Sequence, residues 1–137
     1  MAMKLYLLII YFTPLNSEQP TGSEITGKWL YQGTVNKNNQ TTCCVECPDL
    51  IELSNNGTYK VYNDCYATDP RNPQVETGKW QLVASSEKLI LKERKFLANH
   101  YFLSPKKLID LTVVSVDSKQ LRIRYDQVKT EQYNRAD

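Results

Sequence analysis

Four cysteines lie close together in the chain, and their spacing could support disulfide bonds or a thiolate metal site. They are Cys43, Cys44, Cys47 and Cys65. Cys44 and Cys47 have the spacing of a zinc knuckle, but a zinc site usually contains a second such pair and Cys65 stands alone. An even number of cysteines in an exported chain is typical of a disulfide framework. The sequence therefore predicts two disulfides and no metal site.

The pairing of these cysteines is limited by strand geometry. Neighbouring residues in a strand point to opposite faces, so a bond between Cys43 and Cys44 would be strained. Two connectivities are then open: Cys43 to Cys65 with Cys44 to Cys47, or Cys44 to Cys65 with Cys43 to Cys47. In either one, the bridge to Cys65 closes a loop of about twenty residues and stabilises the fold by roughly 3 kcal/mol.

The reactive side chains do not form a recognisable catalytic pattern. His100 is the only histidine of the chain, so a nucleophile activated by a base would have to be built through it. The carboxylates, including Asp64, Asp69, Glu76 and Glu93, show no spacing typical of an acid/base pair. We therefore expect a protein that is not an enzyme and that uses no cofactor.

The charges of the chain are nearly balanced, with 17 basic and 15 acidic residues. A chain without a strong positive field is not expected to bind nucleic acid. A group of basic residues lies between positions 88 and 107, and we interpret it as a solvated surface. Its members are Lys88, Lys92, Arg94, Lys95, Lys106 and Lys107.

The first residues have the pattern of an export signal. Lys4 precedes an apolar run from Leu5 to Phe12, and Ser17 offers a small residue for cleavage. An apolar run of this length is too short to span a bilayer, so no stable membrane insertion is expected, although the run would also suit a β-strand. We expect a secreted or periplasmic protein with a signal peptide at 1–17, a flexible lead-in at 18–24, one domain at 25–128 and a polar tail at 129–137.

The tetrapeptide Thr26-Gly27-Lys28-Trp29 recurs as Thr77-Gly78-Lys79-Trp80, and each copy opens an apolar run. A glycine followed two residues later by tryptophan indicates a close backbone approach, with the indole filling the sheet beneath it. Asn56-Gly57 between two alternating runs predicts a tight hairpin. Strands are expected at residues 25–35, 41–45, 50–53, 58–62, 75–83, 88–92, 108–116 and 120–125.

Short connections between these sequential strands predict an all-β fold, an antiparallel up-and-down β-barrel of about eight strands. Closure of the sheet into a barrel removes its exposed edges. The segment at 95–105 is expected to be an insertion that covers one end of the barrel.

Four segments resemble the lipocalin-like domains of small exported bacterial proteins. They are Gly27-x-Trp29, Asn56-Gly57-Thr58-Tyr59, Gly78-x-Trp80 and Leu121-x-Ile123-x-Tyr125, and the resemblance covers residues 25–125. It implies a lipocalin-like barrel in which Trp29 closes one end. It also implies that a basic residue from the end of the last strand packs over this indole, and Arg122 or Arg124 matches that position.

A barrel of eight strands can be filled by its own side chains or can hold one small ligand. We expect this barrel to bind a small apolar or amphipathic molecule in its mouth. Alternation predicts the lining as Tyr59, Val61, Leu82, Leu89, Leu91, Leu111, Val113 and Ile123. The alternative is a solid-core interaction module that contacts a protein or an envelope component.

Overall fold

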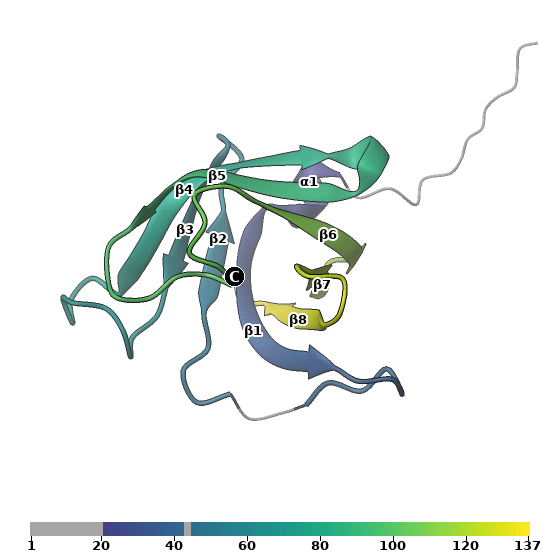
Figure 1. The fold of residues 1–137 in the computed structure, drawn as a ribbon, viewed down its shortest axis with the longest axis horizontal. Coiled ribbons are helices and arrows are strands. Elements are labelled where there is room, and N and C mark those ends of the chain that lie inside the picture. The colour runs from purple at the N-terminus through teal and green to yellow at the C-terminus, as the bar shows by residue number, and fades with distance from the viewer. Residues whose placement is uncertain (1–20, 43–44) are drawn as a thin grey trace, which may run out of the picture.

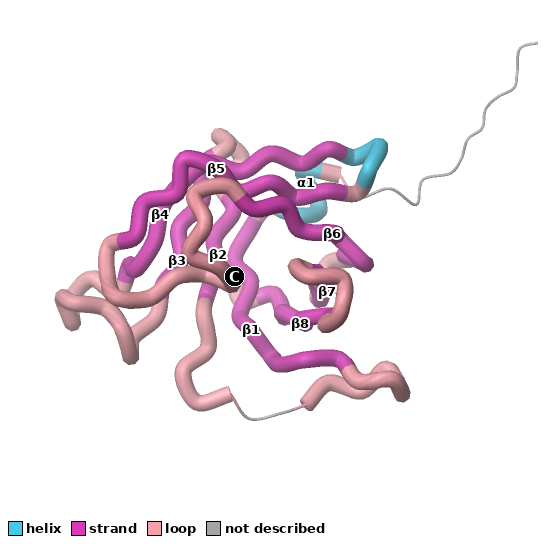
Figure 2. Tube along the Cα trace, in the orientation of Figure 1, coloured by secondary structure: helices cyan, strands magenta, loops and turns pink. Residues whose placement is uncertain are grey.

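The protein folds into a closed antiparallel barrel (Figure 1). The structure, a computed structural model, describes residues 21–42 and 45–137. Its strands follow one another around the barrel in chain order: β1 Gly27–Val35, β2 Leu50–Leu53, β3 Thr58–Tyr62, β4 Gln74–Val83, β5 Lys88–Phe96, β6 Ile109–Val116, β7 Gln120–Arg124 and β8 Thr130–Arg135. Figure 2 shows that helix is confined, within the described residues, to α1 Gly22–Ile25 and the 3-10 helix η3 Ala84–Ser86.

This architecture confirms the predicted all-β up-and-down barrel of eight strands. The hairpin at Asn56-Gly57 has the expected register, with Leu53 opposite Tyr59. Gly57 has a φ of 87°, a backbone conformation that favours glycine. The inward-facing apolar side chains of all eight strands form one core.

The eighth strand is not the one that the sequence predicted. Residues 41–45 contribute one isolated bridge, between Thr41 and Val35, and positions 43 and 44 lie outside the described residues. The predicted polar tail instead contains β8, which pairs with β1 and β7. Tyr133, which is buried, is the one apolar side chain of this strand. Alternation is invisible in such a polar strand, so the prediction of a polar tail is wrong, and the barrel extends to Arg135.

The helix α1 closes the barrel end at which β1 begins. A capping box between Thr21 and Glu24 starts this helix, so the part of the predicted flexible lead-in from residue 21 is helical. Residues 18–20 and the predicted signal peptide at 1–17 lie outside the described residues. Ile25 and Trp29 are fully buried, and the indole N–H of Trp29 donates to the Ile25 carbonyl at 2.8 Å. We call this end of the barrel the closed end.

A single guanidinium ties the closed end together. The guanidinium carbon of Arg135 lies 4.2 Å from the centroid of the Trp29 ring, a cation–π distance. Its nitrogens also donate hydrogen bonds of 2.8 Å to three backbone carbonyls, those of Glu24, Thr26 and Ser118. Arg135 therefore links the last strand to the start of the barrel.

Arg122 and Arg124, which were predicted to cover Trp29, lie elsewhere. Arg122 donates to Gln132 at 3.1 Å, and Arg124 donates to Thr130 at 3.2 Å. The prediction is wrong because it took β7 as the last strand. β8 follows it and places Arg135 opposite Trp29 in the β1–β8 register.

The repeated Thr-Gly-Lys-Trp segment is explained by packing. A Cβ atom at Gly78 would lie 2.6 Å from the ring of Tyr59, so glycine makes room for this ring. Gly27 has a φ of 125°, and the Arg135 guanidinium lies where its Cβ would be. The indole of Trp80, like that of Trp29, donates to a backbone carbonyl, here at 2.7 Å. Both copies of the repeat are therefore structural.

Candidate functional site

The mouth is the barrel end opposite the closed end, where β1, β3, β5 and β7 finish. Long connections meet there, among them residues 63–73, which join β3 to β4, and residues 97–108, which join β5 to β6 (Figure 1). The prediction that an insertion around 95–105 covers one end of the barrel agrees with this arrangement. The candidate site is built from these two connections, the residues that precede β2 and the strand ends below them.

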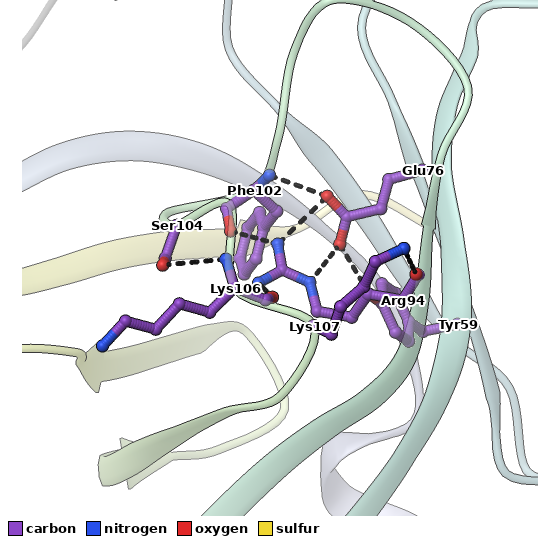
Figure 3. Close-up of polar contacts among 7 residues, drawn as sticks. All are labelled: Tyr59, Glu76, Arg94, Phe102, Ser104, Lys106 and Lys107. Carbon is purple, nitrogen blue, oxygen red and sulfur yellow. Dashed lines mark hydrogen bonds and ion pairs between the residues drawn. The ribbon is translucent and has the colours of Figure 1, made fainter.

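A buried ion pair lies beneath the mouth (Figure 3). The side chains of Glu76 on β4 and Arg94 on β5 are both fully buried, and Arg94 Nε and Nη2 donate to the two carboxylate oxygens of Glu76 at 3.0 and 3.2 Å. The Tyr59 hydroxyl donates to Glu76 Oε2 at 2.5 Å. Burial, followed by this hydrogen bond, raises the pKa of Tyr59 above its usual range. The phenol therefore stays neutral and remains a donor to the carboxylate.

The same ion pair holds residues 97–108 in the mouth (Figure 3). Arg94 donates to the carbonyls of Phe102 at 2.7 Å and Lys106 at 2.8 Å, and the backbone N–H of Phe102 donates to Glu76 Oε1 at 2.8 Å. The Phe102 side chain is 1% exposed, and its ring centroid lies 6.0 Å from that of Tyr133 on β8. The connection is thus anchored to β4 and β5 and packs against β8.

The disulfide of the described residues joins Cys47 to Cys65. Both predicted connectivities paired Cys65 with Cys43 or Cys44, so both are wrong about the partner of Cys65. The prediction placed a strand at residues 41–45 before the hairpin, whereas Cys47 is the cysteine that lies nearest to the start of β2. Cys43 and Cys44 lie outside the described residues. The bond ties the chain before β2 to the β3–β4 connection.

Removing this disulfide should destabilise the domain. For a sequence separation of 18 residues, the chain-entropy account gives a loss of about 3 kcal/mol for the paired change Cys47→Ser and Cys65→Ser. The measurement is urea unfolding followed by circular dichroism. If the wild type and the double variant were equally stable under non-reducing conditions, the pairing of Cys47 with Cys65 would be contradicted.

Aromatic rings form a row along the outer side of the mouth. His100 Nε2 lies 2.8 Å from Asp49 Oδ1, and the side-chain amide of Asn63 donates a hydrogen bond of 2.8 Å to the same oxygen. The His100 ring stacks on that of Tyr66 with centroids 4.3 Å apart and an interplanar angle of 1°, and Tyr101 lies next at 6.5 Å and 14°. Tyr66 and Tyr101 are 46% and 47% exposed. The two mouth connections thus present a fixed and exposed aromatic surface.

The opposite side of the mouth is formed by β1 and β8. The Tyr31 hydroxyl donates to Glu131 Oε1 at 2.5 Å, and the Thr34 hydroxyl donates to the same oxygen at 3.1 Å. The Tyr31 ring lies 5.2 Å from the buried ring of Tyr133. Burial, with the Glu131 hydrogen bond next in importance, raises the pKa of Tyr31 to about 12.

High pH should unfold the domain as its tyrosines ionise. The pKa of Tyr31 and that of Tyr62 on β3 are both raised to about 12, Tyr62 by burial and then by its hydrogen bond to Glu52. In the unfolded chain a tyrosine pKa is about 10, so above that pH the unfolded state holds fewer of these protons and stability falls with rising pH. We expect tyrosinate absorbance and loss of circular dichroism to rise together between about pH 10 and 12. Full ionisation near pH 10 with a native spectrum would contradict these contacts.

The predicted lining residues all lie in the barrel interior. Seven of them are buried in the single core, and Leu82 is partly buried and packs against it. The buried seven are Tyr59, Val61, Leu89, Leu91, Leu111, Val113 and Ile123. The alternation used to select them therefore identified inward-facing residues, and in the structure these side chains pack against one another.

The hollows of the described chain include several that are lined mainly by surface and rim residues. A hollow of about 510 Å³ lies over the outer faces of β1, β2 and β3, beside the disulfide, with Leu30, Leu50 and Tyr62 among its lining residues. Within residues 21–42 and 45–137, no cluster of three or more His, Cys, Asp or Glu side chains is placed to hold a metal ion. In the same part of the chain, no helix has the length and apolar content needed to cross a membrane.

Comparison with known proteins identifies the family. The profile of the NlpE N-terminal domain matches residues 31–124, more than half of the chain. The chain belongs to the NlpE N-terminal domain family. The match begins after Trp29 and ends with β7, so the closed-end contact between Trp29 and Arg135 lies beyond it.

The barrel of this NlpE domain is also similar to a solved structure. That structure is a lipocalin-like protein from Bacteroides uniformis ATCC 8492, with 11% identity and a TM-score of 0.55 over 82% of this chain and 99% of that one. At this identity the similarity concerns the fold alone, and it confirms a lipocalin-like barrel. No curated protein matched the chain.

Sequence reasoning missed the ion pair that organises the mouth. Glu76 lies on the inward alternation of β4 with Gly78, so its position could have been found. The inward position of Arg94 could not have been found, because the register between β4 and β5 shifts at Glu93, which has a φ of 51°. This extra residue turns Arg94 inward. The arginine had been assigned to the solvated basic surface, and that interpretation is wrong for Arg94.

Proposed function

We propose that this NlpE domain is an exported binding module that fills its barrel with its own side chains and contacts a partner through the mouth. The observation that carries the proposal is the buried Glu76–Arg94 pair, which fixes residues 97–108 across the barrel end. A ligand carrier needs a concave interior site with a path to it. Here Phe102 and the ion pair occupy that path.

A small apolar ligand would have to displace these groups. Moving Phe102 out of the mouth breaks the hydrogen bonds that its backbone makes with Arg94 and Glu76. Buried polar and charged groups that lose their partners cost free energy that a small apolar contact does not return. The predicted lining residues pack against one another in the core, which also supports a filled barrel. The interaction module is therefore favoured over the ligand carrier.

The mouth offers a surface suited to a protein partner. Tyrosine is enriched at the energetic centres of interfaces, because it supplies a large contact area with few rotatable bonds. The exposed rings of Tyr66 and Tyr101 flank His100, which is already fixed by its contact with Asp49. A surface ordered before binding loses little conformational entropy when the partner arrives.

We further propose a secreted or periplasmic location and a role without catalysis. The Cys47–Cys65 disulfide supports the location, since such bonds persist mainly in oxidising compartments. His100 supports the role, because its ring is stacked on Tyr66 and its Nε2 is engaged by Asp49. In this arrangement the imidazole positions the mouth surface.

The test is titration with N-phenyl-1-naphthylamine, an apolar dye that fluoresces in hydrophobic cavities. We expect no saturable fluorescence with the wild-type domain and a clear increase with Phe102→Ala, which removes the side chain from the mouth. Tyr101→Ala is the matched control, because it removes an exposed aromatic from the same connection and should behave as wild type. Stoichiometric dye binding by the wild type would show an open barrel and contradict the proposal.

A further inference from the structure

Two carboxylates at the mouth lack a lysine or arginine partner among the ion pairs of the described residues. Glu131 uses Oε1 for both of its hydrogen bonds, from Tyr31 and Thr34. Asp49 uses Oδ1 for its contacts with Asn63 and His100. The second oxygen of each carboxylate takes no hydrogen bond from the described chain, and both residues are partly exposed. They therefore place negative charge and two free acceptors within reach of solvent.

The hydroxyl group of Tyr133 on β8 is a third polar group at this site, and it makes no hydrogen bond within the described residues. Tyr133 is 1% exposed, with its ring against those of Tyr31 and Phe102. No hydrogen bond in residues 21–42 and 45–137 involves its hydroxyl, although every fully buried side-chain nitrogen and oxygen in this part of the chain has a partner. The hydroxyl must then keep the small remaining exposure of this side chain.

The charges of Asp49 and Glu131 converge on the same two phenols. Burial raises the pKa of Tyr133 most, and the charges of Asp49 and Glu131 raise it further. The same two carboxylates, after burial and the Glu131 hydrogen bond, contribute to the raised pKa of Tyr31. Asp49 precedes β2 and Glu131 lies on β8, so the two charges approach the phenols from opposite sides of β1.

The geometry points to a site for a lysine side chain of the partner, with its ammonium seated between Asp49, Glu131 and the Tyr133 hydroxyl. This inference rests on the proposed function, because it names the group that the mouth of the binding module would receive. An ammonium has three donors and no acceptor, which matches three free oxygen acceptors. The rings of Tyr31 and Tyr133 add faces on which a cation is stabilised. A metal ion fits less well, since the described residues form no ligand cluster.

The probe for this site is Nα-acetyl-lysine methylamide, titrated into the 15N-labelled domain and followed by NMR. The matched ligand is Nα-acetyl-norleucine methylamide, which has a similar chain without the ammonium. We expect saturable shifts at Tyr31, Glu131 and Tyr133 with the lysine ligand, with a Kd on the order of 1–10 mM. The norleucine ligand should give no saturable shift at these residues.

Two variants separate binding from folding. Tyr133→Phe removes a hydroxyl without a partner, so the thermal midpoint should stay near that of wild type while the affinity for the lysine ligand falls several-fold. Glu131→Gln removes the charge but keeps an acceptor for Tyr31, and it should weaken binding about tenfold, as expected for one charge-assisted contact. Glu87→Gln makes the same charge change on the exposed hairpin at the closed end and should bind as wild type.

The outcomes are distinct from those of the dye experiment. Equal shifts with both ligands, unchanged affinity in Glu131→Gln, or the absence of any saturable shift would overturn the lysine site. A wild-type domain that fails this test but excludes the dye would still be a filled binding module. A domain that takes up the dye in its barrel would contradict the proposed function itself.

Discussion

Replacing Arg94 with methionine is expected to lower the free energy of unfolding by about 3 to 5 kcal/mol, because it leaves the Glu76 carboxylate buried and unpaired. Both side chains are fully buried, and Glu76 keeps its contacts with Tyr59 and Phe102 after the change. The variant also loses the two hydrogen bonds that hold residues 97–108. Urea unfolding followed by circular dichroism measures the loss.

Two controls make this result specific to the buried pair. Combining Arg94→Met with Glu76→Leu removes both charges, and the double variant should recover a large part of the loss. Lys79→Met breaks the exposed pair between Lys79 and Glu93 at 3.3 Å, and exposed pairs contribute less than about 1 kcal/mol. A single Arg94→Met variant as stable as Lys79→Met would contradict the account of the mouth.

Trp29→Ala is expected to cost about 3 to 5 kcal/mol, since it opens a cavity at the closed end. The side chain is fully buried, its N–H bonds the Ile25 carbonyl, and Arg135 lies over its ring. Thermal or urea unfolding gives the value. Trp80→Ala is the matched control from the other copy of the repeat, because Trp80 is only partly buried.

The result distinguishes two views of the repeated segment. If Trp29 closes the barrel, its removal should cost clearly more than removal of Trp80. Equal losses, or a stable Trp29→Ala variant, would show that the closed end does not depend on this indole. Arg135→Met should reproduce part of the Trp29→Ala loss, since it removes the cation above the same ring.

The barrel could be predicted because most of its strands alternate clearly. The hairpin at Asn56-Gly57 has both turn chemistry and flanking alternation, and its register is as expected. β8 has neither: Glu131 and Gln132 accept hydrogen bonds from Tyr31 and Thr41, contacts that a strand pattern does not show. The basic cover of Trp29 was missed for the same reason, because Arg135 belongs to that strand.

The mouth was harder to predict than the wall. The inward turn of Arg94 follows from the register shift near Glu93, and alternation of polarity cannot reveal such a shift. The partner of Cys65 depends on the path of the chain between β1 and β2. A strand was expected at 41–45, whereas the structure has one isolated bridge there, at Thr41. The site therefore depends on irregular backbone segments, whereas the alternation of polar and apolar residues predicts only regular strands.

The most direct test of a filled barrel is native mass spectrometry of the domain purified under native conditions. The account predicts that the gently ionised protein has the mass of its own polypeptide, with no small molecule attached. A stoichiometric adduct of fixed mass that is lost on denaturation would contradict it.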